Sequence, residues 1–207
     1  MGSSVRPRRL GRSLADQTLK EVLTVAHPCA TWSTSITFDS MGTEDLLHPS
    51  AAAVAAILAV KAPDVEVRQL ETSTRTAAEA ATAVGCEPGA IANSLVFVAE
   101  DGPVLILASG AHRVDLELVE AVTGLAKLRR ATPEEVRAAT GQPIGGVAPV
   151  GHPAALRTLV DQYLARYPTV WAAAGTPHAV FATTFDQLVE LTGGTPARVA
   201  EDDPATH

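Results

Sequence analysis

The sequence predicts an α/β fold of the α+β type, in which a mixed, largely antiparallel, curled or barrel-like sheet is surrounded by helices. Helical and strand-like segments interleave without the strict alternation that builds a doubly wound parallel sheet. Two apolar runs, residues 94–100 and 103–109, flank the pair Asp101-Gly102 and form the clearest antiparallel hairpin of the chain. Of the 207 residues, 46% are hydrophobic, which is enough for one sizeable core.

The first element is expected to be a helix from Ser50 to about Lys61. Val54, Ile57 and Leu58 place an apolar stripe on one face of this alanine-rich segment, and Pro63 stops it. Residues 65–70 (VEVRQL) then predict a strand. Further strand candidates follow the hairpin at 127–131 (KLRRA), 145–150 (GGVAPV), 169–174 (TVWAAA) and 179–184 (AVFATT).

Three more helices are predicted by capping boxes, in which a Thr side chain and a Glu or Gln three residues later each satisfy the other's free backbone N–H. These helices begin after Thr76, Thr132 and Thr184 and end near Gly85, Gly141 and Gly193. Asp115 is the expected N-cap of a further helix.

Charge and the lack of sustained periodicity in residues 1–40 divide the chain into an extension and one domain. Residues 1–40 carry five basic and three acidic side chains, a net +2 against −7 for the whole chain, which leaves −9 on the remainder. We expect residues 1–40 to be a disordered extension, 41–200 one domain beginning near Met41, and 201–207 a flexible tail. The chain lacks an apolar run of about 20 residues and a secretory signal, so we expect a cytoplasmic protein with no membrane partner.

The acidic domain also limits nucleic-acid binding. Lys and Arg supply most of the non-specific affinity for phosphate backbones, so DNA binding is not expected and any RNA contact should be local. A basic cluster formed by Lys127, Arg129 and Arg130, with Arg137 nearby, is interpreted either as such a contact or as a solvated strand edge.

Common catalytic signatures are absent from the sequence. It contains no G-x-S-x-G elbow, H-E-x-x-H zinc helix, phosphate-binding G-x-x-x-x-G-K loop or G-x-G-x-x-G turn. Cys29 and Cys86 lack the paired spacing of a zinc or dithiol site. Neither a metal nor an organic cofactor is predicted.

Two loops rich in small residues remain as site candidates. Residues 140–153 (TGQPIGGVAPVGHP) combine four glycines with three prolines, which is costly unless the backbone takes positive φ or approaches a ligand closely. Residues 171–181 (WAAAGTPHAVF) place a Gly-Thr-Pro-His turn between two apolar runs. Tight loops without a ligand are the alternative interpretation.

With these segments in order, residues 50–195 resemble the YbaK and prolyl-tRNA synthetase-associated editing family. The resemblance rests on TAAEAATAVGCEPGAIANSLVF (76–97), LILASGAHRVD (105–115), GGVAPVGH (145–152) and VWAAAGTPHAVFATTFDQL (170–188). It implies hydrolysis of the ester between a wrong amino acid and the terminal adenosine of tRNA, here by a free-standing protein because synthetase domains are lacking. The tRNA would be that for proline or a similar small-residue tRNA. The implied partner is an aminoacyl-tRNA acceptor end, with an aminoacyl-tRNA synthetase as a second candidate.

The resemblance also implies site residues. Gly145-Gly-Val-Ala-Pro149 fits the Gly-x-x-x-Pro loop that lines the family's aminoacyl pocket, whose backbone groups would position the attacking water and the reacting carbonyl. The catalytic candidates are Asn93, Gly145, Gly146, Val147 and Pro149. The substrate-binding candidates are Thr76, Ser94, His112, Arg113, Gly151, Gly175, Thr176 and His178.

Asn93 departs from the family pattern, in which a lysine occupies this position of the A-K-[ST]-L stretch. An amide donates hydrogen bonds but carries no charge for the terminal nucleotide. Three interpretations follow: Asn93 takes the role with altered substrate preference, Arg113 or Arg75 supplies the charge, or the protein binds without hydrolysing. Besides the editing hydrolase, the alternatives are therefore a binding module without turnover and an esterase or amidase acting on a small aminoacyl compound.

Overall fold

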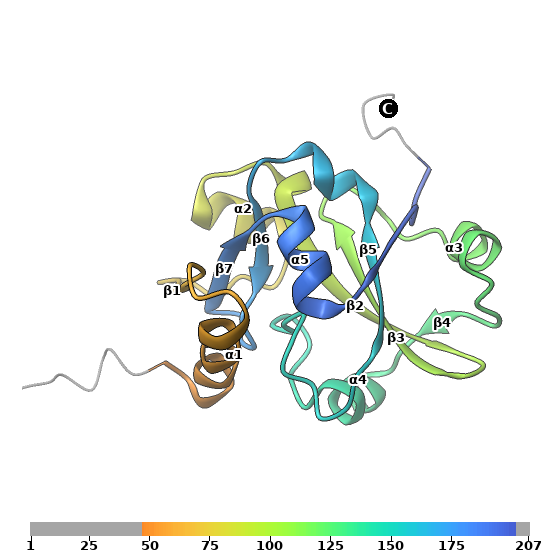
Figure 1. Cartoon of the computed structure of the whole chain (residues 1–207), viewed down its shortest axis with the longest axis horizontal. Coiled ribbons are helices and arrows are strands. Elements are labelled where there is room, and N and C mark those ends of the chain that lie inside the picture. The colour runs from red at the N-terminus through yellow and green to blue at the C-terminus, as the bar shows by residue number, and fades with distance from the viewer. Residues whose placement is uncertain (1–46, 202–207) are drawn as a thin grey trace, which may run out of the picture. The chain divides into compact units, whose positions relative to one another are not determined.

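The computed structural model describes residues 47–201 (Figure 1). The predicted extension 1–40, the predicted start at Met41, Cys29 and residues 202–207 lie outside this range. No helix between residues 47 and 201 is long and apolar enough to cross a bilayer. The helices are α1 (Pro49–Lys61), α2 (Ala77–Val84), α3 (Leu116–Thr123), α4 (Pro133–Thr140) and α5 (Phe185–Thr192), with 3-10 helices η2 (Pro88–Ala90) and η3 (Gln162–Arg166). The strands are β1 (Val67–Gln69), β2 (Ile91–Ala99), β3 (Gly102–Ser109), β4 (Arg129–Arg130), β5 (Arg157–Asp161), β6 (Val170–Ala173), β7 (Ala179–Thr183) and β8 (Thr195–Ala197).

The strands form one mixed sheet in the order β1-β7-β6-β2-β3-β5-β8, with β4 added to the edge of β2. Four pairings are antiparallel: β1 with β7, β7 with β6, β2 with β3, and β2 with β4. Three are parallel: β2 with β6, β3 with β5, and β5 with β8. The predicted fold class, a mixed sheet with helices packed around it, is confirmed.

Helices cover both faces of the sheet, as the alternation of side chains along β3 requires. Leu105 and Leu107 point into the larger core cluster, which includes residues of α1, α4 and α5. Val104 and Ile106 point into a second cluster, which includes Val119 of α3. In Figure 1, α1 and α3 lie at opposite ends of the sheet. Each fully buried Leu or Ile contributes about 1.5–3 kcal/mol relative to an exposed one.

The predicted helix starts are borne out by their hydrogen bonds. Reciprocal capping boxes are present at Thr76 and Thr132, and the side chain of Asp115 accepts from the N–H of Leu118. At α5 the box is only half formed. Thr184 accepts from the N–H of Gln187, but the Gln187 side chain bonds Thr183 and Asp64 instead of the N-cap backbone.

Two local expectations differ from the structure, and two strands were missed. The hairpin turn consists of Glu100 and Asp101 rather than Asp101-Gly102, because Ala99 pairs with Gly102. Residues 145–150 form a loop, not a strand, since glycine at positive φ and proline do not sustain ladder bonds. The parallel strands β5 and β8 were not predicted, because residues 157–161 and 195–197 are short and carry no alternating pattern.

Candidate functional site

An interruption in strand pairing creates the main cavity. Along the outer edge of β2, β6 pairs only with Ile91 and Ala92, and β4 pairs only with Phe97 and Val98. Residues 93–95 therefore have no strand partner on this side within the described range. A cavity of about 520 Å³ opens here.

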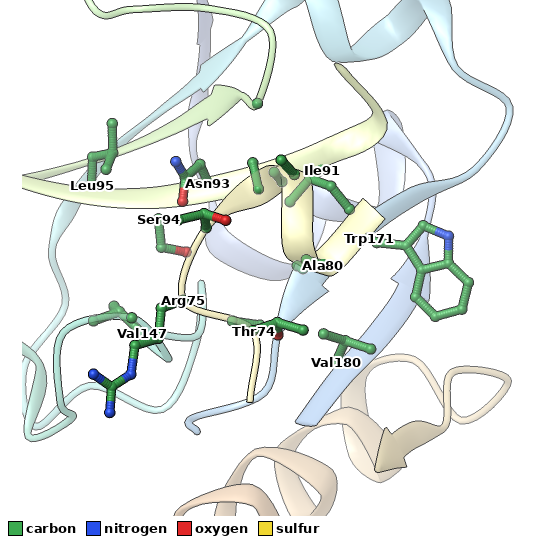
Figure 2. Close-up of a pocket in the computed structure, with 18 of the residues that line it drawn as sticks. Thr74, Arg75, Ala80, Ile91, Asn93, Ser94, Leu95, Val147, Trp171 and Val180 are labelled. Atoms are coloured by element: carbon green, nitrogen blue, oxygen red, sulfur yellow. The ribbon is translucent and has the colours of Figure 1, made fainter. Parts of the chain in front are cut away.

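Segments that are far apart in sequence line this cavity (Figure 2). Its walls are residues 93–95 of β2, the glycine loop at 144, 145 and 147, the start of α2 with the segment before it, the turn after β3, and parts of β6, β7 and the loop between them. The structure thus brings the predicted segments 92–95, 145–147 and 176 together. Of the predicted site residues, the lining includes Thr76, Asn93, Ser94, His112, Arg113, Gly145, Val147 and Thr176.

The glycine loop owes its position to two close approaches. Gly145 has a φ of 89°, in the region that glycine adopts readily, and the stem of Arg75 lies beside it. Gly146 lies against the backbone of Thr176, where a Cβ atom on Gly146 would be only 2.4 Å from the Thr176 carbonyl carbon. The pairing of these two loops therefore depends on a missing side chain at position 146. Gly146 does not line the cavity, but its contact with Thr176 positions the residues on either side of it, which do.

Hydrogen-bond donors lie along this loop. Within residues 47–201, the N–H groups of Gly145 and Val147 donate to no backbone oxygen, whereas the N–H of Gly146 donates to Pro143. On the opposite wall Ser94 has a buried Oγ without a partner in the same range. Asn93 is half-buried at the cavity wall. The cavity thus combines backbone N–H groups that have no backbone partner in the described range with short polar side chains.

Three arginines supply positive charge around the cavity: Arg75, Arg113 and Arg130. All three are exposed, and none forms a salt bridge with another described residue. In the basic cluster predicted from the sequence, Lys127 instead pairs with Glu100, at 2.9 Å. Arg129 pairs with Glu135, at 2.6 Å.

The neighbouring residues Arg129 and Arg130 differ, because Arg129 forms an ion pair with Glu135 and Arg130 forms none with a described residue. The Arg129 guanidinium, together with the N–H of Thr132, lowers the pKa of Glu135 to about 2. Both members of the pair are exposed, so the pair itself adds little stability. Arg130 keeps its charge available at the cavity.

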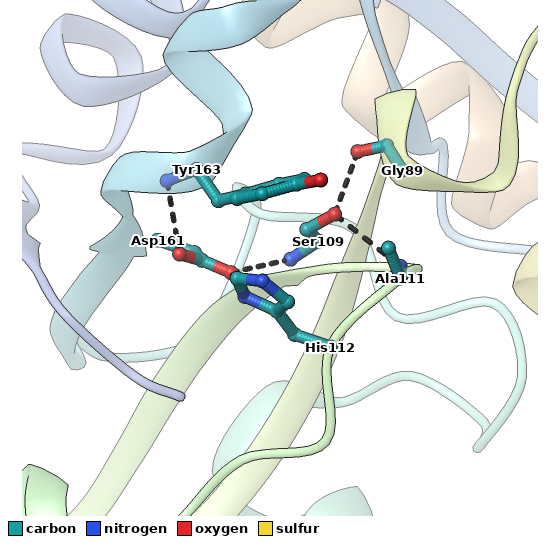
Figure 3. Close-up of polar contacts among 6 residues, drawn as sticks. All are labelled: Gly89, Ser109, Ala111, His112, Asp161 and Tyr163. Carbon is teal, nitrogen blue, oxygen red and sulfur yellow. Dashed lines mark hydrogen bonds and ion pairs between the residues drawn. The ribbon is translucent and has the colours of Figure 1, made fainter. Parts of the chain in front are cut away.

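A buried carboxylate anchors the turn that carries His112 and Arg113 (Figure 3). One oxygen of Asp161 accepts from the N–H of Ser109, at 2.9 Å, and from Nδ1 of His112, at 2.8 Å. The other accepts from the N–H of Tyr163, at 3.0 Å. The His112 ring lies 4.2 Å from the Tyr163 ring, and its Nε2 is buried without a partner in the described chain.

This arrangement limits the role of His112. The side chains of His112 and Asp161 are only 3% and 2% exposed, so the histidine is held as part of the wall rather than displayed to solvent. The bond to Asp161 favours the tautomer with the proton on Nδ1. Asp161 and Tyr163 were not identified from the sequence, since 49 residues separate Asp161 from His112.

The other predicted site residues lie elsewhere. Pro149 and Gly151 line a separate cavity of about 320 Å³ beside His152. Gly175 packs against the backbone of Ser50, and His178 is exposed and outside the lining of the main cavity. Burial lowers the pKa of His152, whose Nε2 lies 2.9 Å from the carbonyl oxygen of Ala148.

Several lining residues were not singled out from the sequence. Trp171 and Ile91 contribute apolar wall, and Ile144 is 58% exposed at the glycine loop. Nothing in the sequence marks these three residues as site residues except that they lie close to predicted ones. No group of three or more metal-ligating side chains occurs in the part of the chain that the structure describes.

Comparisons with known proteins agree with this geometry. The family model "Aminoacyl-tRNA editing domain" matches residues 71–191. A crystal structure described as "a putative trans-editing enzyme for prolyl tRNA synthetase" is 49% identical, covers 75% of this chain and 99% of its own, and superposes with a TM-score of 0.71.

Two curated relatives match most of the same region. The "Uncharacterized protein YwhH" of Bacillus subtilis (strain 168) is 35% identical over 127 residues, which is 61% of this chain and 80% of the relative. The "Putative Cys-tRNA(Pro)/Cys-tRNA(Cys) deacylase EbsC" of Enterococcus faecalis (strain ATCC 700802 / V583) is 27% identical over 126 residues, or 56% of this chain and 77% of the relative.

Proposed function

Because the chain belongs to the aminoacyl-tRNA editing domain family, we propose that it is a free-standing hydrolase that deacylates mischarged tRNA in trans. The proposed substrate is tRNA for proline, or a similar tRNA, that carries a wrong small amino acid. The relative EbsC is named as a "Putative Cys-tRNA(Pro)/Cys-tRNA(Cys) deacylase", and the 49%-identical structure as "a putative trans-editing enzyme for prolyl tRNA synthetase", which supports this choice of tRNA.

One observation carries the proposal. A single cavity brings together the unpaired edge of β2, the free N–H groups of the glycine loop and three arginines without salt bridges among the described residues. The domain is acidic overall, so this local positive charge suits a short phosphate-bearing end better than a long duplex.

The chemistry follows from these groups. An aminoacyl ester is already activated, so orienting a water molecule and stabilising the developing oxyanion supply much of the rate. In the proposed complex the N–H groups of Gly145 and Val147 donate to the reacting carbonyl oxygen as it gains charge. Asn93 and Ser94 hold the ribose and the amino acid from the opposite wall, and the arginines hold the phosphates.

Asn93 favours one alternative function, a module that binds aminoacyl-tRNA or a synthetase without turnover. Its neutral amide cannot give the terminal nucleotide the charge of the lysine found in similar editing proteins. In the proposed hydrolase, Arg113, Arg75 and Arg130 compensate for this missing charge. They lie around the same cavity as Asn93.

The test is a panel of mischarged tRNAs incubated with the purified full chain. We expect release of a wrong amino acid from at least one proline-type tRNA, and no release from the correctly charged one. Saturable binding of the whole panel without release would instead establish the binding module. Equal hydrolysis of aminoacyl esters that lack tRNA would point to a small-molecule esterase.

A further inference from the structure

The side chain of Gln142 spans the glycine loop from within. Gln142 is 6% exposed and is the only asparagine or glutamine among the buried polar residues of the described chain. Its Oε1 accepts from the N–H of Ala148, at 2.6 Å, and its Nε2 donates to the carbonyl of Val150, at 3.3 Å. The amide thus joins one end of the loop to residues six and eight positions further on.

This brace is itself anchored in α4. The N–H of Gln142 donates to Oγ1 of Thr140, at 3.1 Å, and that hydroxyl donates to the carbonyl of Val136, at 2.7 Å. Ala148 is held from its other side as well, because its carbonyl lies 2.9 Å from Nε2 of His152. The base of the loop is therefore fixed to a helix through side-chain bonds rather than through a strand ladder.

The residues between the two ends of the brace form the cavity wall. Ile144, Gly145 and Val147 line the cavity, and Gly146 packs against Thr176. The N–H groups of Gly145 and Val147 have no backbone partner in the described range, so nothing on their own side fixes their direction. Their direction therefore depends on the position of the loop, which the Gln142 brace sets together with the contact between Gly146 and Thr176.

We propose that Gln142 is a positioning residue, whose side-chain amide sets the direction of the Gly145 and Val147 N–H groups in the cavity. It does not touch the substrate. The kinetic part of this inference rests on the proposed deacylation. The structural part concerns the loop alone and can be tested without it.

The first variant is Gln142→Met, which keeps the length of the side chain and removes both hydrogen bonds. Because a displacement of about 1 Å can cost roughly a hundredfold in rate, we expect kcat for the best mischarged tRNA to fall by about that factor. KM should stay within about twofold, since the arginines that bind the phosphates are unaffected.

The second variant, Gln142→Glu, tests the positioning role through the pH dependence of kcat. An ionised carboxylate still accepts from the N–H of Ala148, but its second oxygen faces the carbonyl of Val150 and cannot donate. When protonated, the carboxyl restores that bond, and burial favours the neutral form. Relative to the unmodified protein at each pH, kcat of this variant should therefore rise as pH falls from 8 to 5. The same ratio for Gln142→Met should stay flat.

The control is Thr183→Val at the end of β7, outside the lining of the main cavity. It removes the hydrogen bonds that the side chain of the buried Thr183 donates to Gln187 Oε1 and to the carbonyl of Thr184. Hydrogen–deuterium exchange of peptides covering residues 143–150 supplies the structural readout. Exchange there should accelerate in Gln142→Met and stay unchanged in Thr183→Val.

The outcomes separate the two proposals. Absence of turnover by the unmodified protein on every tRNA would refute the deacylase, while exchange in the loop would still decide whether Gln142 holds it. Unchanged exchange in Gln142→Met, an unchanged kcat, or an equal loss of kcat in Thr183→Val would each overturn the positioning role.

Discussion

The contact between Gly146 and Thr176 gives the sharpest mutational prediction. A Cβ atom at position 146 would lie 2.4 Å from the carbonyl carbon of Thr176, 2.6 Å from its Cα and 2.7 Å from the nitrogen of Pro177. Carbon atoms normally approach no closer than about 3.5 Å, so the deficit is roughly 1 Å. Gly146 is not among the glycines with positive φ, so alanine meets a steric barrier there and not a backbone one.

The facing loop cannot easily yield. The carbonyl of Pro177 accepts from both the N–H and the hydroxyl of Thr74, at 2.8 and 3.0 Å, and Ala174 and Ala179 are joined by a backbone bond of 2.8 Å. All three atoms nearest the added methyl belong to the backbone. The glycine loop must therefore move away from Thr176 by about 1 Å.

We expect Gly146→Ala to cost about 1–3 kcal/mol of stability by overpacking. For a domain of this size that corresponds to about 2–4 °C in Tm for each kcal/mol. The loss of activity should be larger, roughly a hundredfold in kcat, because the loop carries the N–H donors of the cavity. Thermal unfolding and single-turnover deacylation measure the two effects separately.

Gly194→Ala is the matched control. A Cβ there would also be too close to its neighbours, with Oγ1 of Thr192 and Cγ2 of Val160 both at 2.8 Å, but it is not among the residues that line the main cavity. We expect a loss of stability without a specific loss of kcat. A folded Gly146→Ala protein with unaltered kcat, or equal activity losses in both variants, would refute the reasoning.

Three further predictions concern single side chains. Asn93→Ala should lower kcat/KM for a mischarged tRNA by roughly tenfold to a hundredfold, because the variant loses the hydrogen bond that is proposed to hold the substrate, and an unchanged value would remove Asn93 from the site. Asp161→Asn should destabilise the domain by about 1.5–3 kcal/mol in denaturant unfolding, because the carboxylate accepts from three N–H groups on both of its oxygens and an amide presents an oxygen to only one side; a loss below about 0.5 kcal/mol would contradict the anchoring role. Because burial depresses the pKa of His152, the unfolded chain binds the proton more readily, so the stability that neutral His152 contributes is present above its ordinary pKa of 6.5 and declines as pH falls below it. His152→Gln keeps a donor for the Ala148 carbonyl but does not titrate, so its unfolding free energy should depend less on pH between 5.5 and 7.5, and identical pH profiles would disprove the assignment.

The sequence alone determined the features that short-range chemistry decides. Two complete capping boxes, the N-cap at Asp115 and the β2–β3 hairpin all depend on residues within a few positions of one another, and all were predicted. The half-formed box at Gln187 shows the limit of this approach. A local pattern permits a bond, but the distant Asp64 competes for the same side chain.

The candidate site, too, was predicted from the sequence only in part. The glycine loop, Asn93 and the 175–178 turn were chosen from composition and resemblance, and the structure places part of each at one cavity. Five of the chosen residues lie outside its lining: Gly146, Pro149, Gly151, Gly175 and His178. Whether they act in catalysis stays a prediction. Side-chain direction and loop path depend on packing, which the order of residues does not show.

Only the tertiary structure decided the parallel strands β5 and β8, the Asp161 anchor, the Gln142 brace and the place of Arg130 at the cavity. Parallel pairing joins segments far apart in the chain, so neither strand carries a local turn signal. Asp161 and Gln142 are polar residues that burial would normally disfavour, and hydrogen bonds that form only after folding make their burial stable. The amino-acid order specifies those partners only through the fold that brings them together.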